Sequence, residues 1–250
     1  MNASRTDVIN RVFVLLSTFV VSPGISCKIL RTLLYISTLI ILILSCSTQD
    51  KEKIQEKRTF FHTLAPPNDS TTFYFKTKHE WKGTNDNALD TFVNTWYSKM
   101  LFALKEPVLK EFNGDKEIYR FTWLRTFHHP VSVRLEKQGG VVKLFSKVCN
   151  GAGGYEPGQI IFDTIFSLTQ KQVDTTNIKL DLAKFWTLQT ESRENVGLDG
   201  SEWIIEVYKR NKYHMVVRWT PDNGTAFRNI GDYLFSISQI KNEKGEHSDY

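Results

Sequence analysis

The side chains best suited to binding a ligand lie near the end of a predicted strand. Residues 117–127 (EIYRFTWLRTF) are rich in β-forming residues, and alternation along a strand places Trp123 and Arg125 on the same face. An indole next to a guanidinium offers an aromatic platform and a two-pronged cation for a carboxylate or a sugar. The structural alternative is an ion pair from Asp199 or Glu202 to Arg, with Trp as packing; this is the usual state of a buried charge.

Four further polar groups are also expected to face a ligand: His129, Tyr155, Asp199 and, on another predicted strand, Arg218. The adjacent pair His128 and His129 does not predict a metal site, because neighbouring side chains on an extended chain point to opposite faces. No cysteine pair is present to complete such a site. We expect no metal and no cofactor.

Catalytic motifs give weaker signals. His129, Tyr155 and Asp199 are the candidates for an alternative function, an envelope hydrolase, and they would have to meet in one pocket. The sequence has no Gly-x-Ser-x-Gly elbow and no recognisable triad or carboxylate dyad. No reaction is assigned on this basis, and we lean towards a protein that is not an enzyme.

A glycine-rich stretch follows a predicted strand. Residues 150–158 (NGAGGYEPG) contain four glycines, but a phosphate-binding loop would need Lys-Ser/Thr and a helix directly after it. The next residues, QIIF, are typical of a strand. We therefore expect a loop that reverses the chain, with a ligand-facing loop carrying Tyr155 as the alternative.

Strands and helices that must position these residues follow from the apolar pattern. Strands are expected at 72–77, 117–127, 131–137, 141–148, 159–168, 202–209 and 213–219. Tight turns at 138–140 (QGG) and 210–212 (RNK) join two pairs of them into hairpins. Runs of strands followed by helices predict an α+β fold, an antiparallel sheet of hairpins covered on one face by about three helices.

Each of the three helices has a recognisable start. Asn85 or Asp86 can cap the first, whose apolar stripe runs to residue 104. Thr169 and Gln172 have the spacing of a capping box and begin the second, which runs to about residue 182. Thr225 can cap the last helix.

The first 46 residues differ from the rest of the chain. Lys28 and Arg31 precede an uncharged run of 13 residues that begins at Leu33. This run is short for a membrane span of roughly 20 residues and suits the apolar core of a signal peptide, about 7 to 15 residues long. A cleaved signal peptide is therefore expected.

Residues 43–46 (ILSC) resemble the lipobox of bacterial lipoproteins, and Cys46 ends the apolar run. The resemblance implies that a diacylglyceryl group is attached to the Cys46 sulfur and that cleavage occurs just before it. The polar residues 47–58 resemble the tether of surface or outer-membrane lipoproteins of the Bacteroidetes type. The implied organisation is a signal peptide at 1–46, a tether at 47–58 and one domain at 59–250, anchored in the bacterial envelope at the outer membrane or the periplasmic face.

Two other arrangements of the N-terminus stay open. The apolar run could be a single membrane span, lengthened by Thr32 and by the uncharged residues 47–49, with Lys28 and Arg31 held inside. The earlier apolar run at 12–22 also allows a two-span or re-entrant N-terminus. In the single-span case the α+β domain would lie outside the cytoplasm.

Charge and cysteine content exclude some classes. Removing the four cations and one acid of residues 1–46 leaves 28 basic and 26 acidic residues, a net charge of +2 against +5 for the whole chain. No nucleic-acid partner is expected, because such binding needs a clustered basic face. The remaining cysteine, Cys149, has no partner but Cys46, so no disulfide framework is predicted.

Residues 115–240 also resemble bacterial envelope domains of unknown function. The resemblance lies in the segments IYRFTWLRTFHHPVSVRLEKQGG, SLTQKQV and LDGSEWIIEVYKRNKYHMVVRWTP. It implies a sheet of hairpins with helices and no particular activity. The sequence therefore predicts a lipid-anchored binding or structural component of the envelope, whose protein or polymer partner it does not identify.

Overall fold

The computed structural model describes residues 61–78, 88–192, 197 and 199–241. The chain divides into two compact units, Met1–Glu56 and Lys57–Tyr250, and every described residue belongs to the second. Cys46, the rest of the leader and the predicted caps Asn85 and Asp86 lie outside the described residues. Within the described ranges, no helix is both long enough and apolar enough to cross a membrane.

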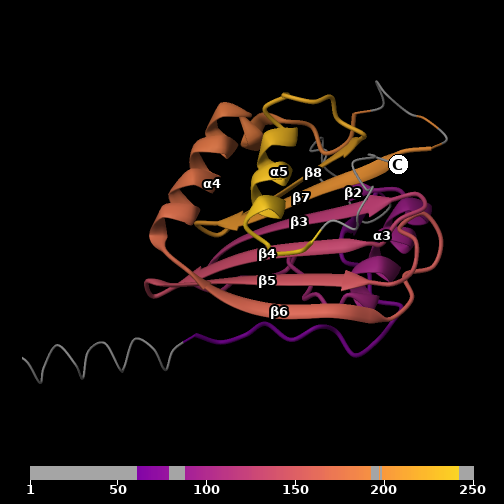
Figure 1. Cartoon of the computed structure of the whole chain (residues 1–250), viewed down its shortest axis with the longest axis horizontal. Coiled ribbons are helices and arrows are strands. Elements are labelled where there is room, and N and C mark those ends of the chain that lie inside the picture. Colours follow the sequence, from indigo (N-terminus) through magenta and orange to yellow (C-terminus); the bar gives the residue numbers. More distant parts are fainter. Residues whose placement is uncertain (1–60, 79–87, 193–196, 198, 242–250) are drawn as a thin grey trace, which may run out of the picture. The chain divides into compact units, whose positions relative to one another are not determined.

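A six-stranded antiparallel sheet forms the centre of the second unit (Figure 1), in the order β6-β5-β4-β3-β7-β8. Its strands are β3 (Glu117–Arg125), β4 (Val131–Gln138), β5 (Val141–Cys149), β6 (Ile160–Leu168), β7 (Ser201–Lys209) and β8 (Lys212–Trp219). Successive strands form hairpins, and the pairing of β3 with β7 joins the first four strands to the last two.

Local turn chemistry sets the hairpins. Gly139 and Gly140 have φ values of 55° and 85°, and Arg210 and Asn211 have φ values of 52° and 59°. Two successive residues with positive φ make the turn that matches the twist of paired strands. The tight turns predicted at 138–140 (QGG) and at 210–212 (RNK) are confirmed.

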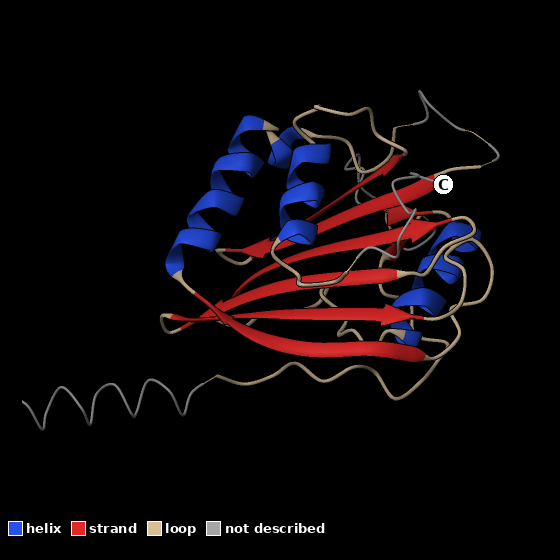
Figure 2. Ribbon diagram, viewed as in Figure 1, coloured by secondary structure: helices blue, strands red, loops and turns tan. Residues whose placement is uncertain are grey.

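Helices cover both faces of the sheet (Figure 2). Helices α4 (Gln170–Leu182) and α5 (Arg228–Ser236) pack on one face, where Val173, Ile230 and Leu234 join a core with Phe121, Val133 and Ile205. Helix α3 (Thr91–Ala103) lies on the other face, where Met100 and Leu101 join a second core with Leu124 and Ile204. The α+β class with an antiparallel sheet and three helices is confirmed. The prediction that helices cover only one face of the sheet is wrong. Neighbouring residues of β7 such as Ile204 and Ile205 point to opposite faces, and both are apolar and buried.

The starts of the helices agree with the predicted caps to different degrees. Helix α3 begins after the predicted caps Asn85 and Asp86: its N-cap is Asp90, whose Oδ1 accepts a 2.9 Å hydrogen bond from Val93 N. At α4 the predicted capping box of Thr169 and Gln172 is present, and the Thr169 N–H donates to Gln172 Oε1 at 3.0 Å. The N-cap of α5 is Phe227, two residues after the predicted Thr225, whose Oγ1 accepts from Arg228 N at 3.4 Å.

The remaining elements are short. Only the last two residues of the predicted strand at 72–77 are regular, as β1 (Lys76–Thr77), which pairs in parallel with β2 (Ala88–Leu89). The 3-10 turn η1 (Phe185–Thr187) follows α4. Leu89 of β2 and helix α3 contribute to the core on the second face of the sheet, whereas Phe185 of η1 joins the core under α4 and α5.

Candidate functional site

The candidate site lies at one end of the sheet, where β3 and β5 finish and β4 and β6 begin. The glycine-rich loop packs there against the turn between β3 and β4, with Gly153 N donating to His128 O at 2.9 Å and Gly154 N to Thr126 O at 3.2 Å. A Cβ atom on Gly153 would lie 2.7 Å from the carbonyl oxygen of Arg125, so a side chain would prevent this approach. The loop reverses the chain, as expected, and closes this end of the sheet.

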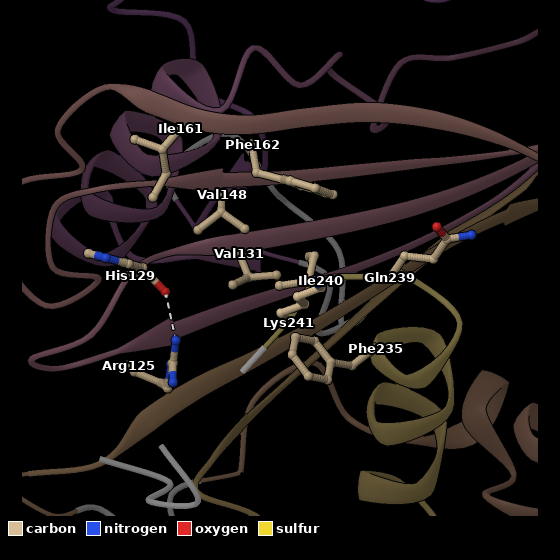
Figure 3. A pocket seen from close by; sticks show the side chains of 10 residues that line it. All are labelled: Arg125, His129, Val131, Val148, Ile161, Phe162, Phe235, Gln239, Ile240 and Lys241. Atoms are coloured by element: carbon tan, nitrogen blue, oxygen red, sulfur yellow. Dashed lines mark hydrogen bonds between the residues drawn. The ribbon is translucent and has the colours of Figure 1, made fainter. Parts of the chain in front are cut away.

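A pocket of about 290 Å³ opens beside this loop, on the face covered by α5 (Figure 3). Its apolar walls are Val131, Val148, Ile161, Phe162, Phe235 and Ile240. Its polar lining is Arg125, His129, Gln239 and Lys241. The described residues that line the pocket therefore include two permanent cations and no acid.

A bulge explains why two successive residues of β6 reach the pocket. Val148 pairs with Phe162 and Cys149 with Ile160, so Ile161 is the extra residue between them. Such a bulge bends the strand and redirects side chains. Ile161 and Phe162 thus both line the cavity, although strict alternation would separate them.

Trp123 and Arg125 share one face of β3, as the alternation predicts. The guanidinium carbon of Arg125 lies 4.4 Å from the centroid of the Trp123 ring, and Arg125 Nη2 donates to the carbonyl oxygen of His129 at 3.4 Å. Both side chains are buried, Arg125 to 4% and Trp123 to 8% exposure. Trp123 also contacts the pocket wall, since its ring centroid is 5.5 Å from that of Phe235, edge to face.

The indole N–H of Trp123 is buried, and no residue in the described part of the chain accepts a hydrogen bond from it. A buried donor without an acceptor is costly, and native proteins contain few of them. The ring that carries this donor contacts Arg125 and Phe235, two residues that line the pocket.

His129 lines the pocket through a ring that turns away from Arg125 (Figure 3). Its Nδ1 lies 2.9 Å from the carbonyl oxygen of Gly151. No group of three or more His, Cys, Asp or Glu side chains suited to a metal ion occurs among the residues that the structure describes.

Tyr155 and Asp199 do not line this pocket. Tyr155 is 60% exposed on the glycine-rich loop and stacks on Phe127, with ring centroids 6.1 Å apart. Asp199 is exposed just before β7. The structure therefore does not gather His129, Tyr155 and Asp199 around this cavity.

Arg218 belongs to a second, smaller hollow of about 180 Å³ near the end of β8. Its Nη1 and Nη2 both donate to the carbonyl oxygen of Gln189 at 3.1 Å, and its guanidinium carbon lies 5.6 Å from the Phe227 ring centroid. These contacts tie the segment before β7 to β8. They give Arg218 a structural role in the described part of the chain.

The pocket wall that is formed by the end of α5 and the segment after it was not predicted from the sequence. Phe235, in the last turn of α5, forms part of this wall. Gln239, Ile240 and Lys241 belong to the segment that follows the helix and complete the wall. Gln239 has a positive φ of 60°, which turns the chain at that point. The sequence contains no turn residue such as glycine there to signal this.

A network of buried charges on the sheet face opposite α5 was also not predicted from the sequence. Arg120 Nε donates to Glu206 Oε2 at 2.6 Å, and Arg134 Nε donates to Glu106 Oε2 at 2.7 Å. Burial acts to raise the pKa of Glu106, but Arg134, Lys147 and Arg120 outweigh it and hold this pKa below its ordinary value. Charged residues at alternate positions of β3 and β4 were the sequence signal that could have indicated this network. Because the buried cations and carboxylates pair with one another, we assign the network a structural role.

Chemically, the pocket can bind a small molecule. It has apolar walls and a guanidinium that stacks on the Trp123 ring. None of the described residues that line it is a Ser, Thr, Cys, Asp or Glu, so His129 has no nucleophile or acid beside it in the lining. No family model matches the sequence, and comparison with curated proteins gives no match either.

Proposed function

We propose that this chain is a lipid-anchored protein of the bacterial envelope whose folded domain is a binding component, with the pocket at Arg125 as its binding site. The observation that carries the binding role is the pocket itself, with six apolar side chains around a few convergent polar groups. Ligand sites are commonly built in this way. The lipid anchor is supported by the resemblance of residues 43–46 to a lipobox.

The way in which the chain enters the domain is compatible with this role. His62 N donates to Gln138 Oε1 at 3.2 Å, and the Phe61 ring lies 6.5 Å from that of Phe145. Gln138 ends β4, whose first residue, Val131, lines the pocket. A strand of this length spans roughly 24 Å, at about 3.4 Å per residue. Phe61 and His62 therefore contact the sheet near the end of β4 that lies away from the pocket.

Binding can be tested with the full-length protein in lipid nanodiscs, with empty nanodiscs as the blank for partitioning. Isothermal titration with 3-phenylpropanol, 3-phenylpropionate and 3-phenylpropylamine presents one apolar body with three head groups. We expect saturable binding of at least one probe. Ile161→Trp should fill the pocket and weaken that binding at least about tenfold, since a bulky side chain replaces the ligand's contacts.

The matched control is Ile165→Trp on the same strand. Ile165 is 52% exposed and lies outside the pocket, whereas Ile161 is 56% exposed and lines it. The control should bind as the wild type does. Absence of saturable binding for all three probes, or equal loss in both variants, would contradict the proposed function.

A further inference from the structure

We infer that β6 is a self-association surface: two copies of this chain pair their β6 strands antiparallel about Ile165 and so join two six-stranded sheets into one continuous sheet. The inference is independent of the ligand pocket and goes beyond the proposed binding function. It is carried by three features of the described residues: an open sheet edge, apolar side chains left partly exposed along that edge, and a strand sequence that is complementary to itself.

The first feature is the open edge. Strand β6 lies at one edge of the six-stranded sheet (Figure 1), and an edge strand presents a row of N–H and C=O groups to which another strand can pair. No backbone hydrogen bond joins Ile160–Leu168 to a described residue outside β5. At the opposite edge, Val217 N of β8 donates to Thr190 O at 2.6 Å, and His214 Nε2 lies 3.0 Å from Leu188 O. Strand β6 is therefore the edge at which the sheet can grow.

The sequence of β6 lacks most of the devices that protect a sheet edge. Natural edge strands carry lysines, prolines or bulges that prevent association. The strand IIFDTIFSL has no Lys, Arg or Pro, and Asp163 is its only charge. Its bulge falls at Ile161, between the partners of Val148 and Cys149. The seven residues that follow, Phe162–Leu168, pair regularly with β5 and present a regular outer edge.

The second feature is the set of apolar side chains along this edge, which lie on both faces of the sheet. Alternation along the strand places Ile165 on the face opposite α5, where it is 52% exposed. On the other face, Phe162, Phe166 and Leu168 are only partly buried, beside the core under α4 and α5. Because removing apolar surface from water favours association, a strand added to β6 would be stabilised on both faces.

The third feature is the order of residues in β6. In antiparallel pairing about Ile165, this residue faces its own copy, Asp163 faces Ser167, and Phe162 faces Leu168. The carboxylate can then accept a hydrogen bond from the hydroxyl, and large apolar side chains meet one another. Cross-strand pairs of these kinds stabilise antiparallel sheets.

Neighbouring registers are less favourable. Pairing about Thr164 would set Asp163 against Ile165, and pairing about Asp163 would place two carboxylates directly opposite each other. In the register about Ile165, only the pair of Thr164 and Phe166 joins a polar side chain to an apolar one, and the bulge stays outside. A two-fold axis through Ile165 produces a closed dimer, since each copy offers the same strand. A second copy is therefore the partner that this strand fits.

Sedimentation velocity of the full-length protein in a density-matched detergent tests the dimer. One strand pair is small beside a standard interface of roughly 1,600 Å², so we expect a reversible dimer that dissociates at roughly micromolar concentrations. Ile165→Lys places two ammonium groups opposite each other and should weaken the dimer about tenfold. The matched control Ile178→Lys makes the same change on α4, at a side chain that is 59% exposed, and should dimerise as the wild type does.

Opposite charges test the register. Ile165→Glu should also weaken the dimer, because it places two carboxylates opposite each other. An equimolar mixture of Ile165→Lys and Ile165→Glu should dimerise about tenfold more tightly than either variant alone. This recovery requires position 165 to face its own copy, so a mixture as weak as the single variants would overturn the assigned pairing. Circular dichroism monitors the fold of each variant.

Hydrogen exchange of the wild type locates the interface without any substitution. The backbone amides of Phe162–Leu168 should exchange more slowly when the protein is concentrated enough to dimerise, whereas those of Lys212–Trp219 should not change. A protein that stays monomeric at every concentration would overturn self-pairing and leave the edge for an extended segment of another protein. A dimer that Ile165→Lys does not weaken would overturn it as well, because the contact would then lie elsewhere on the chain.

Discussion

The carboxyl group of Glu202 lies on the sheet face covered by α3, where burial raises its pKa to about 7 although a hydrogen bond from Tyr97 opposes the shift. This pKa is above the unfolded value of 4.5, so between these pH values the folded state binds a proton that the unfolded state has released. The stabilisation is complete below pH 4.5 and is lost as the pH rises to about 7.

Glu202→Gln should therefore flatten the dependence of stability on pH and raise stability above pH 7, by on the order of 2 kcal/mol. Glutamine keeps an oxygen for the Tyr97 hydroxyl and removes the charge. Thermal unfolding followed by circular dichroism from pH 4.5 to 8 measures this. Glu156→Gln, on a side chain that is 77% exposed, is the control and should leave the profile unchanged; an equal slope in Glu202→Gln and the wild type would refute the assignment.

Cys149 is fully buried, and this burial raises the pKa of its thiol to about 11, with Lys147 opposing the shift. The nucleophilic thiolate is thus scarce at neutral pH. In native protein at pH 8, the peptide that contains Cys149 should stay unmodified by iodoacetamide, whereas the same peptide should react completely in urea. Peptide mass spectrometry reads this site separately from Cys27 and Cys46. Rapid alkylation in the native protein would show that the thiol is accessible.

At the level of elements, the segment that leads into the domain is held by aromatic and charged contacts. The Phe61 ring centroid lies 4.4 Å from Lys116 Nζ and 4.5 Å from Lys143 Nζ, and the ring also stacks on Phe145. Phe61→Ala should lower the free energy of unfolding by about 1–3 kcal/mol, through lost packing and lost cation–π contacts.

Urea unfolding measures the effect of Phe61→Ala. The matched control is Phe92→Ala on α3, a side chain that is 81% exposed and should change stability by less than about 0.5 kcal/mol. Equal effects in both variants would mean that the segment at Phe61 does not dock on the sheet in solution.

The buried charge network gives a second prediction at this scale. Glu106 accepts from Arg134 and lies 3.2 Å from Lys147 Nζ and 3.6 Å from Arg120 Nη1. Glu106→Gln leaves these buried cations short of one negative charge, which should cost about 3–5 kcal/mol of stability in urea unfolding. Glu111→Gln is the control nearby, with a side chain that is 78% exposed. Similar stabilities of the two variants would contradict the importance of the network.

Much of the fold was predictable because it rests on local signals. Gly139 and Gly140 specify one hairpin, and Thr169 with Gln172 specifies the start of α4. The side on which α3 packs was not predictable in the same way, because β7 presents apolar residues to both faces. The same holds for the charge network, whose partners Glu106, Arg120 and Glu206 are far apart in the sequence.

The candidate site was predictable to the extent that one strand builds it. Alternation along β3 places Trp123 and Arg125 together, and His129 follows in the next turn. Tyr155 and Asp199 are on loops, where no periodicity indicates direction, and both lie outside the pocket. The wall after α5 depends on how a helix packs on a distant sheet, which sequence patterns do not specify.

At the scale of the whole molecule, we propose that a lipid-anchored N-terminus leads into a binding domain. Within that domain, Phe61 and His62 lie near one end of β4 and the pocket lies at the other end. The single-span alternative would keep residues 1–45 and leave Cys46 without a lipid, so the two arrangements differ in where the mature chain begins and in the modification of Cys46.

The most direct test is therefore the intact mass of the N-terminal peptide of protein extracted from the membranes of its native host. The account predicts a peptide that begins at Cys46 and carries a diacylglyceryl or triacyl modification. A peptide that begins at or near Met1, with an unmodified Cys46, would contradict lipid anchoring and favour a membrane span that ends near that residue.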